Sequence, residues 1–315
     1  MPILDKRRRR ARIALKTNGR LRVRSQGQLG DKSSKRIQCG EPILGPLFPI
    51  QSLEDVPAVY RRPHTRHVFC NTSDVAADDP ATQLRERGLA LLRDAFPKDS
   101  LTGLKDAAAR CFEAIVAGKP FPEQYHFNRY SHSVLLTALT DFGGGGSEQL
   151  AAPLSASGLD QLFSEAMGCE WACHMEQSWV RKKFAPLQAP GPEYHLQNWH
   201  QDGALGVRFP LESGPVIPMT PLLTCWIPLN PCGRDSPGLE FIRRRQAALL
   251  HFTELDDAAL RQRFPPQEFW APALELGDGL VFLNGTLHRT YTRPDMRHNR
   301  LSVEYRIFPR DGSGK

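Results

Sequence analysis

The sequence predicts a mainly β protein in which a sandwich or open barrel of short strands follows a helical segment. From about residue 170 onward, short apolar runs alternate with Gly, Pro and Asn turns, which is typical of all-β folds. Upstream, Leu101, Leu104, Ala108 and Cys111 recur at the spacing of a buried helix face. A hydrophobic fraction of 40% and a charged fraction of 24% are ordinary for a globular protein.

The helical segment is expected to contain two helices. The first begins at Asp79, an N-cap residue followed by proline, although residues 89–92 at its end could instead form a strand. The second is capped by Asp99 or Ser100. It ends at Gly118, since glycine favours helix termination.

The strands are expected where apolar residues gather between turn signals. The expected ranges are 171–184, 199–204, 222–229, 239–243, 273–276, 280–284 and 301–308. The chain therefore places helices first and a β-rich barrel after them.

The net charge of +7 is concentrated at the N-terminus. Residues 1–36 hold thirteen Lys or Arg and two Asp, a net charge of +11, so the remainder carries 7 − 11 = −4. High charge with few apolar residues predicts disorder over residues 1–39, which we interpret as a solvated tail rather than a nucleic-acid-binding arm. Residues 40–78 are Pro-rich and are expected to be irregular cover. Residues 79–315 are expected to form the functional domain.

The cysteines and the lack of long apolar runs indicate a cytoplasmic protein. The seven cysteines are odd in number and form no CxxC, which favours free thiols in a reducing compartment. No apolar run is long enough to span a membrane, and no secretory-type apolar stretch follows the basic N-terminus. We therefore expect no membrane partner, and the sequence leaves the oligomeric state open.

The central motif is His200-Gln201-Asp202. In a strand, residues i and i+2 point to the same face, so His200 and Asp202 can offer a nitrogen and an oxygen to one metal ion while Gln201 points away. A third ligand would complete a set of two histidines and one carboxylate. That set leaves open positions and suits non-haem Fe(II) oxygenases.

Among the ten histidines, His288 is the best third ligand. It follows a turn, an apolar run over 280–283 and a second turn at Asn284-Gly285. Its distance from the motif is 288 − 202 = 86 residues. His298 is a rival by sequence distance, but it lies in a charged turn and is expected to be solvated.

The last expected strand supplies a carboxylate clamp. Arg300 and Ser302 share one face of it, while Leu301 and Val303 share the other. An inward Arg binds a carboxylate through parallel N–H bonds, and the Ser hydroxyl adds a donor. Together with the metal ligands, this clamp suits 2-oxoglutarate, which would chelate iron at one end and meet Arg300 at the other.

These motifs carry a family resemblance over residues 80–309. They are the early helical segment at 84–94, the segment 199–204, the segment 225–233 with 236–241, and the segments 277–282, 288–290 and 300–306. In this combination the chain resembles the phytanoyl-CoA dioxygenase-like branch of the Fe(II)/2-oxoglutarate-dependent oxygenases.

The resemblance implies a double-stranded β-helix core, the jelly-roll or cupin-like fold, with an N-terminal helical segment. It also implies Fe(II) on His200, Asp202 and His288, with 2-oxoglutarate on Arg300 and Ser302. O2 would be the co-substrate, and ascorbate would be supportive. Because Asp202 keeps the carboxylate that halogenating members lack, hydroxylation or another oxidation of a small molecule is favoured over halogenation.

Three further residues are predicted near the site. Gln177 shares a strand face with Trp179 and Arg181, from which it could hydrogen-bond 2-oxoglutarate or the substrate. Trp226 and His195 could contact the substrate. For each of the three, core packing or ordinary surface polarity is the competing interpretation.

Two other functions compete with a small-molecule oxygenase. Arg300 and Arg306 have the spacing of the closing motif of AlkB-type nucleic-acid demethylases, but Ser302 replaces the Asn expected there. The body also lacks a basic groove interleaved with aromatic residues, so a nucleic-acid partner is disfavoured. The alternative from another class is a metal-binding jelly roll without turnover, which the intact ligand set and clamp disfavour.

Overall fold

The computed structural model describes residues 79–117, 125–128, 131–188, 198–210 and 216–310. The expectations for the basic tail, residues 1–39, and for the Pro-rich segment, residues 40–78, lie outside the described residues, as does the predicted helix end at Gly118. Within the described ranges, no helix combines the length and apolarity needed to cross a bilayer.

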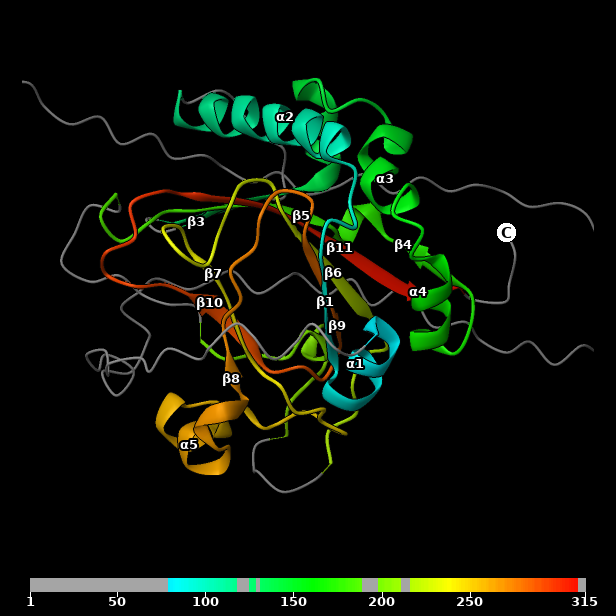
Figure 1. Ribbon diagram of the computed structural model, residues 1–315, viewed down its shortest axis with the longest axis vertical. Coiled ribbons are helices and arrows are strands. Elements are labelled where there is room, and N and C mark those ends of the chain that lie inside the picture. The colour runs from blue at the N-terminus through cyan, green and yellow to red at the C-terminus, as the bar shows by residue number, and fades with distance from the viewer. Residues whose placement is uncertain (1–78, 118–124, 129–130, 189–197, 211–215, 311–315) are drawn as a thin grey trace, which may run out of the picture. The chain divides into compact units, whose positions relative to one another are not determined.

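The larger layer is an antiparallel sheet of eight strands (Figure 1). Its main path follows the order β1-β9-β6-β11-β5-β3-β2, and β4 pairs with the C-terminal end of β11. The strands are β1 (Leu89–Leu92), β2 (Tyr125–Asn128), β3 (Ser131–Leu135), β4 (Trp171–Cys173), β5 (Trp179–Lys183), β6 (Leu223–Pro228), β9 (Gly279–Leu283) and β11 (Arg300–Pro309). The longest strand, β11, therefore lies inside the sheet between β5 and β6.

A smaller antiparallel sheet has the order β10-β7-β8. Its strands are β7 (Gly238–Ile242), β8 (Phe269–Trp270) and β10 (His288–Tyr291). The two sheets pack face to face through an apolar cluster that includes Trp226, Leu280 and Phe282 from the larger sheet and Leu239, Phe241 and Trp270 from the smaller one. This cluster closes one end of the space between the sheets.

The helices cover the outer faces of the two sheets. They are α1 (Pro80–Arg87), α2 (Lys98–Val116), α3 (Ser147–Ser155), α4 (Asp160–Met167) and α5 (Asp257–Arg263). Short 3-10 helices are η3 (Leu136–Phe142), η4 (Met175–Gln177), η5 (Asp202–Ala204), η6 (Phe252–Glu254) and η7 (Pro266–Glu268). Figure 1 shows α2 and α3 along the larger sheet and α5 beside β8 of the smaller sheet.

The side chains of strand β11 point alternately into the main apolar core and into the space between the two sheets. Val303, Tyr305 and Ile307 are fully buried in the main core, which they share with apolar residues of α2 and α3. The alternate side chains, from Arg300 to Arg306, lie on the opposite face, which looks into the space between the sheets. Because strand side chains alternate in direction, a single strand separates the apolar core from a polar interior wall.

The structure confirms the predicted class, with antiparallel sheets and flanking helices. Asp79 caps α1 by accepting from the backbone N–H groups of Ala81 and Thr82, and Gly88 ends the helix at a positive φ of 77°. Residues 89–92 form β1, the strand alternative for that segment. The predicted cap of the second helix at Asp99 or Ser100 was wrong, because this helix begins at Lys98 and its N-cap residue is Pro97.

Three strand predictions were wrong. The expected strand 171–184 is two strands separated by η4, and 273–276 contributes only isolated bridges. The expected strand 199–204 is also absent: His200 forms a single bridge, and the chain then turns into η5. At this turn a Cβ atom at Gly203 would lie 3.0 Å from the carbonyl oxygen of Asn284. Glycine, which has no Cβ, favours this close approach of the two backbones.

The Tyr305 hydroxyl links β11 of the larger sheet to helix α3. It donates to the carbonyl oxygen of Leu150 at 2.7 Å, in a fully buried position. Tyr305→Phe should lower the free energy of unfolding by about 1 kcal/mol, measured by urea denaturation. Thr102→Ala, which removes an exposed helix hydroxyl, should change it by less than ~0.5 kcal/mol. Equal denaturation midpoints for Tyr305→Phe and wild type would contradict the assignment.

Candidate metal centre

His200 and His288 are brought together by backbone pairing. The N–H of His200 donates to the carbonyl of His288 at 3.0 Å, and the reverse bond is 3.1 Å long. His288 opens β10, where it pairs with Phe241 of β7. Asp202 opens η5, two residues beyond the bridge. The backbone therefore delivers three side chains to one place without a regular strand at His200.

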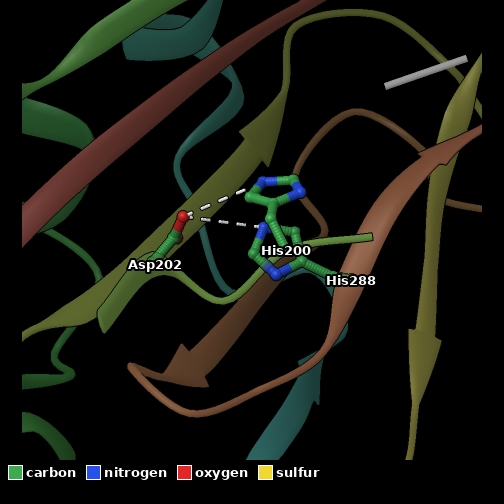
Figure 2. Close-up of side chains that lie close together, drawn as sticks. All are labelled: His200, Asp202 and His288. Atoms are coloured by element: carbon green, nitrogen blue, oxygen red, sulfur yellow. Dashed lines mark ion pairs between the residues drawn. The ribbon is translucent and has the colours of Figure 1, made fainter. Parts of the chain in front are cut away.

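The three side chains converge on a common point. One potential ligand atom from each of His200, Asp202 and His288 lies within 4.8 Å of the others. Asp202 Oδ1 is 4.0 Å from His200 Nε2 and 3.8 Å from His288 Nε2, and Figure 2 shows the carboxylate directed at both rings. These separations are too long for hydrogen bonds. They leave room for an ion between the three groups.

Backbone carbonyls select the ring nitrogen that each histidine presents. His200 Nδ1 lies 3.0 Å from the carbonyl oxygen of Asn198, and His288 Nδ1 lies 3.0 Å from that of Thr286. Since a carbonyl only accepts, each Nδ1 carries the hydrogen in the neutral ring, and each Nε2 keeps its lone pair. This arrangement is typical of metal-binding histidines.

The charge states also suit metal binding. Burial lowers the pKa of His200 to about 4, and His288 adds to the effect, so the ring is neutral at physiological pH. Burial alone would raise the pKa of Asp202, but Arg306 and the two histidines outweigh it and hold that pKa well below its usual value. A neutral imidazole and an ionised carboxylate are the forms that ligate metals.

Gln201 is buried and joins three segments of backbone. Its amide nitrogen donates to the carbonyl of Gly285 at 2.8 Å and to that of Ala248 at 3.2 Å. Its amide oxygen accepts from Leu250 N–H at 2.7 Å. As expected from the alternation, the side chain is not among the three that converge. It fastens the segment between the ligands to the loop that precedes His288.

The outer oxygen of Asp202 is also bound. Thr224 of β6 donates to Asp202 Oδ2 at 2.6 Å, and Arg306 of β11 donates to the same oxygen. Arg306 also pairs with Glu304, which accepts from Arg181 Nε at 2.9 Å. Opposite charges therefore alternate along the interior wall from Asp202 to Arg181.

The predicted clamp lies near the other end of the same wall. Arg300 and Ser302 are buried, and Arg300 Nη1 donates to the carbonyl of Gly238 at 2.9 Å. The Ser302 hydroxyl has no hydrogen-bond partner within the described part of the chain. The Trp226 ring is buried in the inter-sheet cluster, with its centroid 5.3 Å from the Arg300 guanidinium.

Lys183 is a residue that the sequence analysis missed. It is 6% exposed and pairs in register with Arg300 across β5 and β11. Burial lowers its pKa to about 7, helped by Arg300 and Arg181. The signal was available, since Lys183 shares a strand face with Arg181, but a Lys-Lys pair normally indicates a solvated edge.

Gln177 and His195 were also predicted to lie near the site. Gln177 does not share a strand face with Arg181, because it ends η4 just before β5 begins. The Ser178 hydroxyl, which donates to the His174 carbonyl at 2.8 Å and accepts from the N–H of Arg306, holds this interruption in place. His195 lies outside the described residues.

Comparison with known proteins gives the fold. No family model matches the chain, and no curated protein matches it. Solved structures do resemble it: AviO1 from Streptomyces viridochromogenes Tue57 is 16% identical, with a TM-score of 0.51 and coverage of 78% of this chain and 99% of that chain. EctD from S. alaskensis with bound Fe is 17% identical, with a TM-score of 0.51 and coverage of 79% and 82%. EvdMO1 is 15% identical, with a TM-score of 0.51 and coverage of 74% and 49%.

The chain has the double-stranded β-helix fold. This confirms the fold that the family resemblance implied, and the similarity extends over roughly three quarters of the chain. At such low sequence identity, the comparison establishes the architecture, and function must be argued from the side chains of the site.

The pH dependence of the free energy of unfolding tests whether Lys183 is a buried cation. Its pKa is lowered from 10.5 to about 7, so the cost of burying its charge is fully present below pH 7 and disappears as pH rises toward 10.5. Lys183→Met should therefore be more stable than wild type below pH 7. This advantage should shrink by at most about 1.4 kcal/mol per pH unit above it.

Urea denaturation across this pH range measures the difference. Lys182→Met is the matched control, because Lys182 lies on the other face of β5 against Phe184. Parallel stability curves for wild type and Lys183→Met would show that Lys183 is not a buried cation.

Proposed function

We propose that this chain is an Fe(II)- and 2-oxoglutarate-dependent oxygenase that hydroxylates, or otherwise oxidises, an unactivated C–H bond of a small molecule. One observation carries the proposal: inside a double-stranded β-helix, β11 carries both Arg306, which binds Asp202 of a His-Asp-His cluster, and Arg300 of a buried cationic clamp. We assign the activity to the domain formed by residues 79–315.

His200, Asp202 and His288 would hold the iron. Two imidazoles and one carboxylate are the donor set of non-haem Fe(II) oxygenases, and they leave positions for other ligands. The fixed Nδ1 bonds and the ionised carboxylate fit a divalent cation. EctD, a structure of the same fold, contains bound Fe.

Arg300, Ser302 and Lys183 would bind the distal carboxylate of 2-oxoglutarate. Arg300 presents a planar set of donors, which matches a carboxylate. The Ser302 hydroxyl is buried without a hydrogen-bond partner in the described residues, so a ligand oxygen would satisfy it. Lys183 adds a second positive charge beside Arg300. The carboxylate would thus receive charge and hydrogen bonds from two neighbouring strands.

The protein's part in the reaction is to bind, orient and exclude water. When bound, iron with 2-oxoglutarate and O2 supplies the oxidising power, with succinate and CO2 as co-products and ascorbate as a supporting reductant. The rings of Phe241 and Phe282 lie 5.7 and 4.7 Å from the His288 ring, centroid to centroid. They form an apolar wall that limits water on that side of the site.

The reaction class and the compartment follow from other residues. Asp202 occupies the carboxylate position, so the third metal ligand comes from the protein and hydroxylation is favoured over halogenation. The five cysteines in the described residues, including Cys111 and Cys225, form no disulfide. Free thiols fit a reducing compartment such as the cytoplasm.

The metal ligands and the clamp can be tested by turnover. His200→Ala, Asp202→Ala and His288→Ala should each abolish substrate-dependent conversion of 2-oxoglutarate to succinate, because each removes a ligand. Arg300→Ala should raise the 2-oxoglutarate concentration needed for half-maximal rate by at least about tenfold, the equivalent of one charge-assisted hydrogen bond. Succinate is measured chromatographically, with iron content determined in parallel.

His298→Ala provides the matched control for loss of a histidine. His298 is exposed and was the rival by sequence distance, so its variant should keep wild-type turnover. Full succinate production by His288→Ala would overturn the ligand assignment.

The pH dependence of 2-oxoglutarate binding tests Lys183 independently. Because its pKa in the ligand-free site is about 7, Lys183 loses its charge as pH rises above 7. The affinity for the dianion should then fall by up to roughly tenfold per pH unit. Lys183→Met should bind more weakly near pH 6 and should show a flatter profile.

Anaerobic calorimetry with the Co(II)-loaded protein provides the measurement. Arg300→Met is the comparison variant, since it should weaken binding at every pH while retaining the slope. An unchanged slope in Lys183→Met would exclude Lys183 from the clamp.

A further inference from the structure

The Asp202 oxygen that faces away from the histidines accepts hydrogen bonds from two side chains. Oδ1 is the oxygen nearest to both imidazole Nε2 atoms. Oδ2 instead accepts from the Thr224 hydroxyl at 2.6 Å and from the Arg306 guanidinium. The carboxylate thus presents one oxygen to the cluster and commits the other to the sheet.

Thr224 is oriented for this contact by Arg306. Arg306 Nη1 lies 2.6 Å from Thr224 Oγ1 and donates to it, so the hydroxyl hydrogen is left for Asp202. Thr224 is fully buried, and it pairs in register with Arg306 between β6 and β11. The two donors are therefore built on adjacent positions of the rigid larger sheet.

Arg306 is itself held from the opposite side. Its Nη2 donates to Glu304 Oε1, and Glu304 Oε2 accepts from Arg181 Nε at 2.9 Å. The backbone N–H of Arg306 donates to Ser178 Oγ at 3.0 Å. Both the backbone and the guanidinium of Arg306 are therefore held by groups other than Asp202.

We propose that Arg306 and Thr224 are positioning residues that hold the Asp202 carboxylate with Oδ1 directed at a bound metal. The inference rests on the proposed function, because it assumes that the cluster holds a metal. A carboxylate free to rotate would have to be ordered when a metal binds, which lowers metal affinity. With Oδ2 held by Thr224 and Arg306, Oδ1 would already face the metal.

Metal affinity of the purified apoprotein tests the proposal without turnover. Co(II) is the probe, titrated anaerobically into wild type and variants. Thr224→Val is the principal variant, since it removes the donor with little change in shape or charge. It should weaken Co(II) binding by about 10- to 100-fold, the usual effect of losing a partner of a metal ligand. Thr224→Ser retains the hydroxyl and should restore most of the affinity.

Arg306→Lys is the second variant. Lysine keeps the positive charge but cannot reach Asp202 and Glu304 with one planar group, so Co(II) affinity should fall by about tenfold or more. Ser236→Ala is the control, because it removes a buried hydroxyl with an equally short 2.6 Å bond, to the carbonyl of Pro231. It should leave Co(II) affinity unchanged.

The outcomes separate the inference from the function it rests on. Wild-type affinity for Co(II) in both Thr224→Val and Arg306→Lys would overturn the positioning role. If Arg306→Lys does not fold, Thr224→Val decides alone. If His288→Ala binds Co(II) as tightly as wild type, or wild type binds none, the metal site itself fails, and the positioning role fails with it.

Discussion

The backbone pairing of His200 with His288 is the contact on which the site depends. It joins segments that are far apart in the chain, so its two hydrogen bonds must be supported by tertiary structure that offsets the entropy of closing a long loop. That support comes from β10, which pairs with β7 from His288 onward. One imidazole is thus carried by a sheet strand and the other is carried by a residue whose backbone is hydrogen-bonded to the start of that strand, and placement on a regular element gives a site geometric precision.

Charge balance is the second constraint on the interior wall. Buried ions are costly unless they are paired, and the pairs here are arranged in sequence: Asp202 with Arg306, and Glu304 with both Arg306 and Arg181. Lys183 and Arg300 contribute two further positive charges near the other end of the wall. A dianion that reached from the His-Asp-His cluster to this end would complement such a distribution of charge.

The parts of this arrangement that could be predicted are those with a strong local period. The alternation of Arg300, Ser302 and the apolar residues between them indicated both the core face and the interior face of β11. The sequence also singled out the three side chains that the structure brings together, His200, Asp202 and His288. These features survive because they follow from the geometry of a strand and from ligand chemistry, which do not depend on the rest of the fold.

The parts that could not be predicted depend on contacts between distant segments. The turn at Asp202 brings Gly203 close to Asn284, and the buried Ser178 hydroxyl joins the end of η4 to β11. Neither contact leaves a periodic trace in the sequence. Lys183 and Arg306 acquire their roles from neighbouring strands, which the sequence alone does not place in register. Helix α5 is a short element whose burial depends chiefly on Leu260 and Phe264.

The amide of Gln201 has a consequence for how this protein can change. Its three backbone partners lie in two loops, one at residues 248–250 and the other at Gly285. Gln201 therefore fastens both loops to the segment that holds His200 and Asp202, although its side chain is not among the three that converge. The middle position of the His-Gln-Asp motif is thus tied to the framework, which leaves it little latitude for evolution or engineering.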